Sequence, residues 1–221
     1  MSLEIRAVVF DFDGLVLDTE VPVYASWCAA FEAHDAVPPT IEEWSAEIGT
    51  AGSIDLHAWL ADRASRPVDV DAMNEFRRAH RDALLEFEPV RPGVLEWLAE
   101  ADAAELGIAI ASSSPADWVE DHLARLELRE RFAFVVTAGG TLRGKPAPDT
   151  YLEACRRLGV EPADALAVED SPNGIAAAKA AGLRCVTVPN EITATLDLSA
   201  ADLRLVSLAD LTLAEVLLRL E

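Results

Sequence analysis

The sequence predicts an α/β fold, a doubly wound parallel sheet of the Rossmann-like kind with an inserted α-helical cap domain. Short apolar runs recur along the chain, and each is followed by a segment with the apolar spacing of a helix. Strands that are apolar throughout and alternate with helices are typical of a parallel sheet covered on both faces. Residues 19–87 break this alternation, because they hold helical patterns and no strand-like run. We therefore expect a core domain of residues 1–18 and 88–221 and a cap domain of residues 19–87.

Five strands are expected from apolar runs bounded by turn signals, at Ala7–Phe10, Ile108–Ala111, Phe134–Val136, Leu166–Val168 and Cys185–Val188. Helical spacing between them predicts helices at Gly93–Ala104, Ala116–Leu126, Thr150–Leu158 and Pro172–Ala181. Ser171 has the place of an N-cap before the last of these helices, and Gly182 follows its end. Thr212 and Glu215 form a capping box that predicts a final helix at Leu213–Leu220.

The inserted segment contains four amphipathic patterns, at Val23–Ala33, Ile41–Ile48, Ile54–Ala64 and Asp71–Phe87. Aromatic residues at helical spacing usually pack, so we expect three tryptophans in the core of this segment: Trp27, Trp44 and Trp59. Three arginines are expected to form a solvated helix face: Arg77, Arg78 and Arg81.

The composition restricts the partners of the chain. It has 221 residues with 18 Lys and Arg against 39 Asp and Glu, a net charge of −21. Such a charge repels nucleic acid and anionic membranes, so neither is expected as a partner. An anionic substrate would need positive charge supplied locally. The three widely spaced cysteines suit a reducing compartment, and Ala7–Phe10 is too short for a secretory signal, so a cytoplasmic protein without a membrane span is expected.

Polar residues directly after strands are the first candidates for a site, because ligands of open parallel sheets bind at the carboxyl ends of strands. Asp11 and Asp13 follow the first predicted strand, with Gly14 behind them. One interpretation is an acidic, solvated turn. The alternative is functional, because two close carboxylates can hold a divalent cation and divide the roles of nucleophile and acid/base.

Two further segments could supply anion-binding groups. Ser112 opens the stretch SSSP after the second strand, where its hydroxyl either caps the next helix or binds a phosphate oxygen. Lys145 is one of two lysines in the chain and lies between a glycine and a proline. A lone lysine is usually a surface residue, but this one is the best candidate for the local positive charge.

Glu169 and Asp170 follow the predicted strand Leu166–Val168. They could merely favour the positive end of the helix that begins after them. Two more acids at a strand end would, however, repel Asp11 and Asp13 unless a cation lay among them. Oxygen-rich sites of this kind suit Mg²⁺.

The order of these four elements resembles a known family. DFDGLVLDTE, IAIASSSP, GKPAPDTYL and AVEDSPNG together are similar to the four motifs of the haloacid dehalogenase (HAD) superfamily. The resemblance is closest to its subfamily I, which has a helical cap after the first motif and includes phosphatases and β-phosphoglucomutases. It covers essentially the whole chain, although the cap matches only in kind.

The resemblance implies a role for each motif residue. Asp11 is the nucleophile that forms an aspartyl phosphate, and Asp13 is the acid/base whose backbone carbonyl also binds the metal. The phosphoryl oxygens are bound by Ser112, Ser113 and Lys145. The Mg²⁺ ligands are Asp11, Asp13, Glu169 and Asp170. Four residues could contact the substrate near the cap: Thr19, Glu20, Thr50 and Ser53. For the cap segment EIGTAGSIDLHAW, which contains Thr50 and Ser53, the alternative is a helix start with a surface His57.

Departures from related branches narrow the expected reaction. The dehalogenase branch lacks the second aspartate, which is present here as Asp13, and the phosphonate-hydrolysing branch uses a cap lysine, which residues 19–87 lack. β-Phosphoglucomutases carry basic residues where this chain has Val23, Ile48 and Gly52. We therefore expect a Mg²⁺-dependent phosphatase of a small phosphorylated metabolite. A phosphosugar mutase and a non-catalytic phosphate-binding module are the alternatives, and the sequence does not indicate an oligomeric state.

Overall fold

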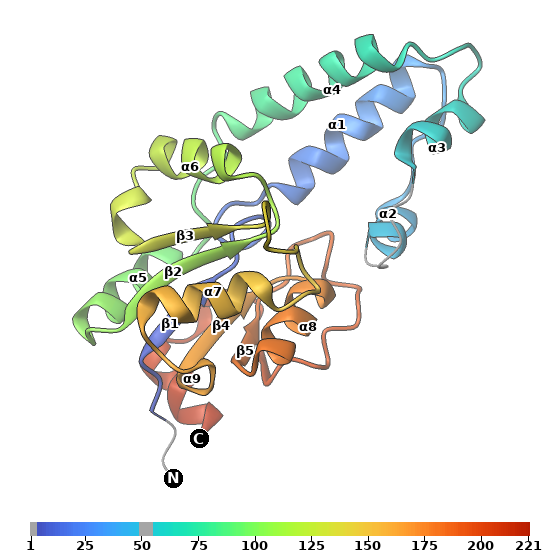
Figure 1. The fold of residues 1–221 in the computed structure, drawn as a ribbon. Coiled ribbons are helices and arrows are strands. Elements are labelled where there is room, and N and C mark those ends of the chain that lie inside the picture. The colour runs from blue at the N-terminus through green and yellow to red at the C-terminus, as the bar shows by residue number, and fades with distance from the viewer. Residues whose placement is uncertain (1–3, 49–54) are drawn as a thin grey trace.

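A computed structural model describes residues 4–48 and 55–221, and it contains a six-stranded parallel sheet (Figure 1). The strand order is β3-β2-β1-β4-β5-β6, and every paired neighbour runs parallel. The strands are β1 Ala7–Phe10, β2 Gly107–Ser112, β3 Phe134–Thr137, β4 Ala165–Glu169, β5 Arg184–Thr187 and β6 Leu203–Arg204. This confirms the predicted α/β fold with a doubly wound parallel sheet.

Helices cover both faces of the sheet, which is why its central strands are apolar throughout. Along β1, Val8 and Phe10 belong to the apolar cluster on one face, and Ala7 and Val9 belong to the cluster on the other. The first face packs against α5 (Val94–Ala103), α6 (Ala116–Arg125) and α9 (Leu213–Leu220). The second packs against α7 (Asp149–Leu158) and α8 (Pro172–Ala181). All four β1 side chains are 0% exposed, so this strand is fixed from both sides.

Between β1 and α5 the described residues form four helices that lie away from the sheet (Figure 1). They are α1 Glu20–Ala33, α2 Ile41–Ile48, α3 Leu56–Arg63 and α4 Val70–Leu85. They share an apolar cluster of their own in which Trp27 and Trp44 are buried and Trp59 is half-buried, as expected. Ile192, from the segment after β5, joins this cluster. Among the helices of the described residues, none is long and apolar enough to cross a membrane.

The two ends of the helical segment lie beside each other. Leu17 and Val90 form an antiparallel bridge, and the Arg91 N–H donates to the Val16 carbonyl at 3.0 Å. The Arg91 guanidinium donates to the carbonyls of Gly14, Val188 and Pro189, so it joins this junction to the segment after β5.

The predicted elements differ from the observed ones mainly at their ends. The strand β5 begins one residue earlier than expected, and α1 begins at Glu20 because Pro22 is tolerated in the first turn of a helix. The two-residue strand β6 was not predicted, since two residues are too few to show a strand pattern. Three short 3₁₀ helices were also missed: Arg129–Arg131, Pro162–Asp164 and Leu208–Asp210. The caps at Ser171 and Thr212 are confirmed.

Candidate active site

The carboxyl ends of β1 and β4 meet at the centre of the sheet, where the strand order reverses. After β3 the chain returns to the other side of β1 and forms β4. This switch point is where ligands bind in open parallel sheets. Asp11 follows β1, Ser112 ends β2 and Glu169 ends β4. The topology therefore brings three of the predicted site residues to one place.

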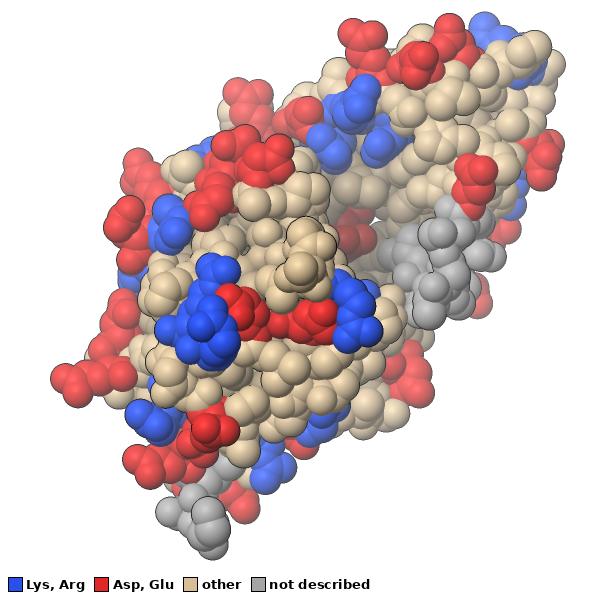
Figure 2. Space-filling model, in the orientation of Figure 1, with Lys and Arg blue, Asp and Glu red and all other residues tan. Residues whose placement is uncertain are grey.

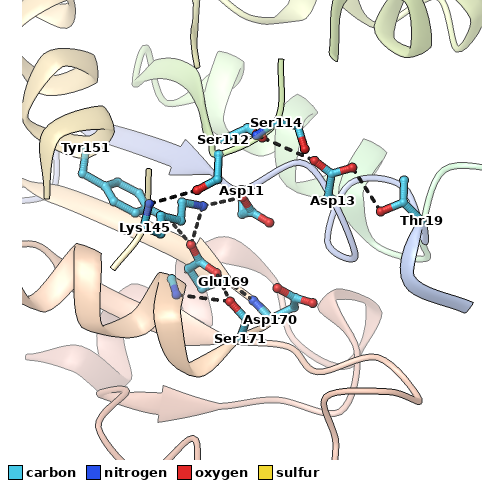
Figure 3. Close-up of polar contacts among 12 residues, drawn as sticks. Asp11, Asp13, Thr19, Ser112, Ser114, Lys145, Tyr151, Glu169, Asp170 and Ser171 are labelled. Carbon is cyan, nitrogen blue, oxygen red and sulfur yellow. Dashed lines mark hydrogen bonds and ion pairs between the residues drawn. The ribbon is translucent and has the colours of Figure 1, made fainter. Parts of the chain in front are cut away.

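Lys145 reaches the same place from the segment between β3 and α7, and its side chain is only 7% exposed. Its ammonium nitrogen contacts Asp11 Oδ1 and lies 2.6 Å from Glu169 Oε1. The Tyr151 hydroxyl donates to that Glu169 oxygen at 2.7 Å, and the Tyr151 ring centroid is 5.1 Å from the Lys145 nitrogen (Figure 3). Lys145 therefore places a positive charge among the buried carboxylates.

The carboxylates around Lys145 outnumber its single ammonium group. Burial lowers the pKa of Lys145, but attraction by Asp11 and Glu169 outweighs burial and holds this pKa above its usual value. Burial, only partly offset by Lys145, raises the pKa of Asp11 from 3.8 to about 8. Burial and repulsion by Asp11 and Glu169 raise the pKa of Asp170 well above its usual value. Three buried acids next to one ammonium group therefore favour a further cation.

The geometry of these acids fits a divalent cation. Asp11, Glu169 and Asp170 each offer a carboxylate oxygen, and these oxygens lie within 4.8 Å of one another. The Asn190 side-chain amide donates to Asp170 Oδ2 at 2.7 Å and holds that carboxylate in place. Oxygen donors of this kind match Mg²⁺, which keeps several waters and takes few carboxylates. The carboxylate of Asp13 is not in this group, so metal binding through its backbone carbonyl remains a prediction.

Two glycines allow the backbone to approach these acids closely. Gly14 has φ +75°, and a Cβ there would lie 2.4 Å from Asp170 Oδ2. A Cβ at Gly174, in the first turn of α8, would lie 1.9 to 2.0 Å from three atoms of the Glu169 carboxylate. Any larger residue at either position would displace a candidate metal ligand.

Asp13 accepts hydrogen bonds from three side chains, two of which, Thr19 and Ser112, are drawn in Figure 3. Its Oδ1 accepts from the Thr19 hydroxyl at 3.1 Å and from the Trp118 indole N–H at 2.8 Å, and its Oδ2 accepts from the Ser112 hydroxyl at 3.3 Å. The Ser112 oxygen also accepts from the Ser114 N–H at 3.0 Å. The structure thus brings Asp13 and Ser112 together directly.

A cavity of about 290 Å³ lies over these groups, and Figure 2 shows a hollow with acidic atoms between the sheet and the upper helices. Its lining includes Asp11, Asp13, Glu20, Lys145 and Asp170. Burial, together with repulsion by Asp13 and Asp18, raises the pKa of Glu20 to about 7.

The remaining predicted contacts differ in their placement. Ser113 lines the cavity, but its hydroxyl oxygen accepts from the Lys145 backbone N–H at 2.9 Å, so it positions the lysine segment. Thr19 is buried and directs its hydroxyl to Asp13. Thr50 and Ser53 lie outside the described residues.

Comparison with known proteins assigns the family. The model for haloacid dehalogenase-like hydrolases matches residues 5–182. The chain belongs to this family.

Its relatives include phosphatases. This HAD hydrolase is 41% identical to YhcW of Bacillus subtilis, which carries the name of a phosphatase, over 96% of each chain. It is 31% identical to hexitol phosphatase B of Escherichia coli over 97% of each. Solved structures of CbbY from Rhodobacter sphaeroides, one with phosphate and one of a variant with xylulose-1,5-bisphosphate, are 30% identical with a TM-score of 0.75 and cover 95% of this chain and 98% of that chain. The expected enzyme class, a phosphoric monoester hydrolase of the HAD superfamily, is confirmed.

Three contacts of this HAD hydrolase's site were not predicted. Asn190 lies just beyond β5, so the search for polar residues after strands would have found it if extended by three positions. Tyr151 is part of the motif GKPAPDTYL but has the spacing of a packed helix residue. Trp118, on α6, also has the spacing of a packed helix residue, so the sequence did not indicate its contact with Asp13.

One expectation about the arginines was wrong. Arg77 and Arg81 are half-buried, with their guanidinium carbons 4.8 Å and 4.5 Å from the ring centroids of Trp27 and Trp118. Helical periodicity did not indicate these contacts because the rings belong to other elements. Arg78 is exposed, as expected.

Proposed function

We propose that this hydrolase is a Mg²⁺-dependent phosphatase that cleaves a small phosphomonoester, such as a sugar phosphate, through an aspartyl phosphate on Asp11. The observation that carries the proposal is the convergence of Lys145 with Asp11, Glu169 and Asp170 at the end of β1. Phosphoryl transfer depends mainly on positioning and on positive charge around the transferred group. Mg²⁺, held by Asp11 and Asp170 with Glu169 behind them, would supply part of that charge.

In the first half of the reaction a carboxylate oxygen of Asp11 attacks phosphorus. The bond to the leaving oxygen breaks, and that oxygen takes a proton from Asp13. The Lys145 ammonium group, which contacts Asp11, binds a phosphoryl oxygen and offsets its charge. Ser112, next to Asp13, is placed to donate a second hydrogen bond to the phosphoryl group.

In the second half Asp13, now a carboxylate, takes a proton from water. The resulting hydroxide attacks phosphorus, the bond to Asp11 breaks, and inorganic phosphate leaves. Asp13 and Asp11 return to their starting states. The separate contacts of these two acids support this division of roles, because Asp11 pairs with Lys145 and Asp13 accepts from neutral donors.

The helical segment 19–87 is proposed to act as the cap that holds the rest of the substrate. A second cavity, of about 330 Å³, adjoins Asp13 and is lined from the helices by Glu20, Val23 and Arg81 and from the sheet side by Trp118. The phosphatase names of the relatives and the xylulose-1,5-bisphosphate bound to CbbY support a phosphorylated sugar as the substrate class. The free cysteines support the expected cytoplasmic location.

A panel of phosphorylated sugars and polyols, including monophosphates and bisphosphates, tests the substrate class by phosphate release. Asp11→Asn should lower turnover of p-nitrophenyl phosphate with Mg²⁺ at least about 10³-fold, because the nucleophile is removed. Asp102→Asn, at a surface ion pair with Arg131, is the matched control and should keep full activity. An Asp11→Asn variant that keeps wild-type activity would overturn the mechanism. An isomerised sugar phosphate in place of free phosphate would favour a mutase.

A further inference from the structure

Trp118 makes the shortest hydrogen bond to Asp13, at 2.8 Å from indole Nε1 to Oδ1. With the Thr19 hydroxyl it saturates this oxygen with two donors. The other oxygen, Oδ2, has a single, longer contact from the mobile hydroxyl proton of Ser112, at 3.3 Å. The contacts therefore fix Oδ1 with two donors and leave Oδ2 as the less constrained oxygen of the carboxylate.

The Trp118 ring contacts two further side chains. The His122 ring packs edge-on against it with centroids 4.3 Å apart, and the Arg81 guanidinium lies over it with its carbon 4.5 Å from the ring centroid. His122 comes from the same helix, α6, but Arg81 comes from α4. The side chain of Arg81 is only 19% exposed, so this cation–π contact is largely shielded from water. Asp13 is thus connected, through one aromatic ring, to the helical segment.

We propose that Trp118 is a positioning residue that fixes the carboxylate of Asp13 for proton transfer, and that Arg81 holds Trp118 in this position from α4. This inference rests on the proposed function, in which Asp13 is the acid/base. It adds a requirement that the motif residues alone do not impose: Asp13 is correctly oriented only while α4 lies against α6. The helical segment then acts on the chemistry through Arg81 and Trp118, separately from any contact it makes with substrate.

If Trp118 positions Asp13, the loss of rate in a Trp118 variant should depend on the leaving group of the substrate. p-Nitrophenolate leaves phosphorus with little help from an acid, whereas phenolate is more basic and depends more on a proton from Asp13. A misoriented Asp13 should therefore slow hydrolysis of phenyl phosphate more than hydrolysis of p-nitrophenyl phosphate. A purely structural loss would lower both rates by the same factor.

Trp118→Phe removes the indole N–H and keeps an aromatic ring beneath Arg81. We expect kcat for phenyl phosphate to fall about tenfold and kcat for p-nitrophenyl phosphate to change less than about threefold, with little change in KM for either. Trp97→Phe is the matched control, because it also removes an indole hydrogen bond, to the Leu211 carbonyl at 2.9 Å, but away from the site. Its ratio of the two kcat values should equal that of the wild type.

Arg81→Met tests the connection to α4. It should lower kcat for phenyl phosphate relative to kcat for p-nitrophenyl phosphate, by a smaller factor than Trp118→Phe does. Arg63→Met, which removes an equivalent cation–π contact with Trp59 at 4.9 Å, should not change the ratio of the two kcat values.

An unchanged ratio in Trp118→Phe overturns the proposal. If that variant folds poorly, replacing Trp118 by benzothienylalanine, which has sulfur in place of the N–H, gives the same decision with an intact ring shape. Retained activity in Asp11→Asn would instead refute the proposed function, so the two failures are distinguishable.

Discussion

The carboxyl edge of the sheet and the helices α1–α4 contribute to the site in different ways. At the edge, Asp11, Lys145, Glu169 and Asp170 are nearly fully buried and their polar atoms contact one another or Asn190 and Tyr151. The described part of the helical segment contributes only a few groups at its margins, among them Glu20 and Arg81. The edge is therefore held together by buried, paired charges, whereas the contacts of the helices depend on how α4 packs against α6.

Under the proposed function, this difference assigns the charge-bearing groups of the reaction to the sheet edge and most contacts with the rest of the substrate to the helices. A buried cluster of opposite charges is costly to form and is tolerated only with close pairing, so its residues have little freedom to vary. The contact between α4 and α6, by contrast, depends on a few side chains such as Arg81 and Trp118. Substitutions at the sheet edge should consequently lower both kcat and stability, whereas substitutions elsewhere should lower mainly one of the two.

The largest expected difference is between the two lysines of the chain. Lys145→Met removes the ammonium group beside Asp11 and Glu169, and we expect kcat to fall about 10³-fold. Leaving buried acids without their partner should also destabilise the fold by about 3 kcal/mol or more. Lys179→Met, which breaks a more exposed pair with Asp202, should cost about 1 kcal/mol or less and leave kcat unchanged. Steady-state kinetics and urea unfolding measure both effects, and equal losses in the two variants would contradict the comparison.

The next effect is the dependence of stability on pH and Mg²⁺. The pKa of Asp11 is raised from 3.8 to about 8, and the pKa of Asp170 is raised as well, so the folded state holds protons that the unfolded chain has released. Without metal this contribution to stability is present below about pH 4 and is lost as the pH rises toward 8. Mg²⁺ at 100 times its Kd should add about 2.7 kcal/mol. The shift in melting temperature between Mg²⁺ and a chelator should therefore grow from pH 5 to pH 8.

Asp170→Asn is the control for that measurement, because it removes one of the converging carboxylates and should reduce the Mg²⁺-dependent shift at every pH. A shift that is independent of pH, or one that Asp170→Asn leaves intact, would contradict the assignment of the metal to these acids.

The smallest expected effect on stability is the loss of a helix N-cap, and two caps can be compared. Ser171→Ala and Asp69→Ala each remove an N-cap, the first from α8 beside the site and the second from α4. Each should cost about 1 kcal/mol in the free energy of unfolding. Only Ser171→Ala should also weaken Mg²⁺ binding, about tenfold, because the first turn of α8 holds Gly174 against Glu169. Titration of activity with Mg²⁺ distinguishes them, and an equal change in both variants would show that the cap effect is not local.

The sequence predicted which side chains gather at the carboxyl edge of the sheet, because most of them follow strand ends. Asp11, Asp13, Ser112, Glu169 and Asp170 all follow or end strands that are visible as apolar runs. Lys145 could be found because lysine is scarce and an anionic substrate requires a cation. For the acids and Ser112 a local pattern carried the information, whereas for Lys145 it was the composition of the whole chain.

The remaining contacts could not be predicted because they depend on packing. Nothing in the spacing of α4 indicates that Arg81 meets a ring of α6, or that this ring then donates to Asp13. Tyr151 has the periodicity of a core residue, and only the fold shows that its hydroxyl reaches Glu169. Asn190 is the exception: it lies three residues beyond β5, so a strand-end search extended to that distance would have found it without knowledge of the packing.

The bridge between Leu17 and Val90 has a consequence for how such proteins diversify. It fastens the outgoing and returning chains together at one point, beneath the helices and next to the first motif. A segment of any length could replace the residues between Leu17 and Val90 if its two ends lie as close together as a pair of bridged strands. Under the proposed function, such a replacement would change the substrate contacts, and it would have to keep Thr19 and Arg81 to preserve the support of Asp13.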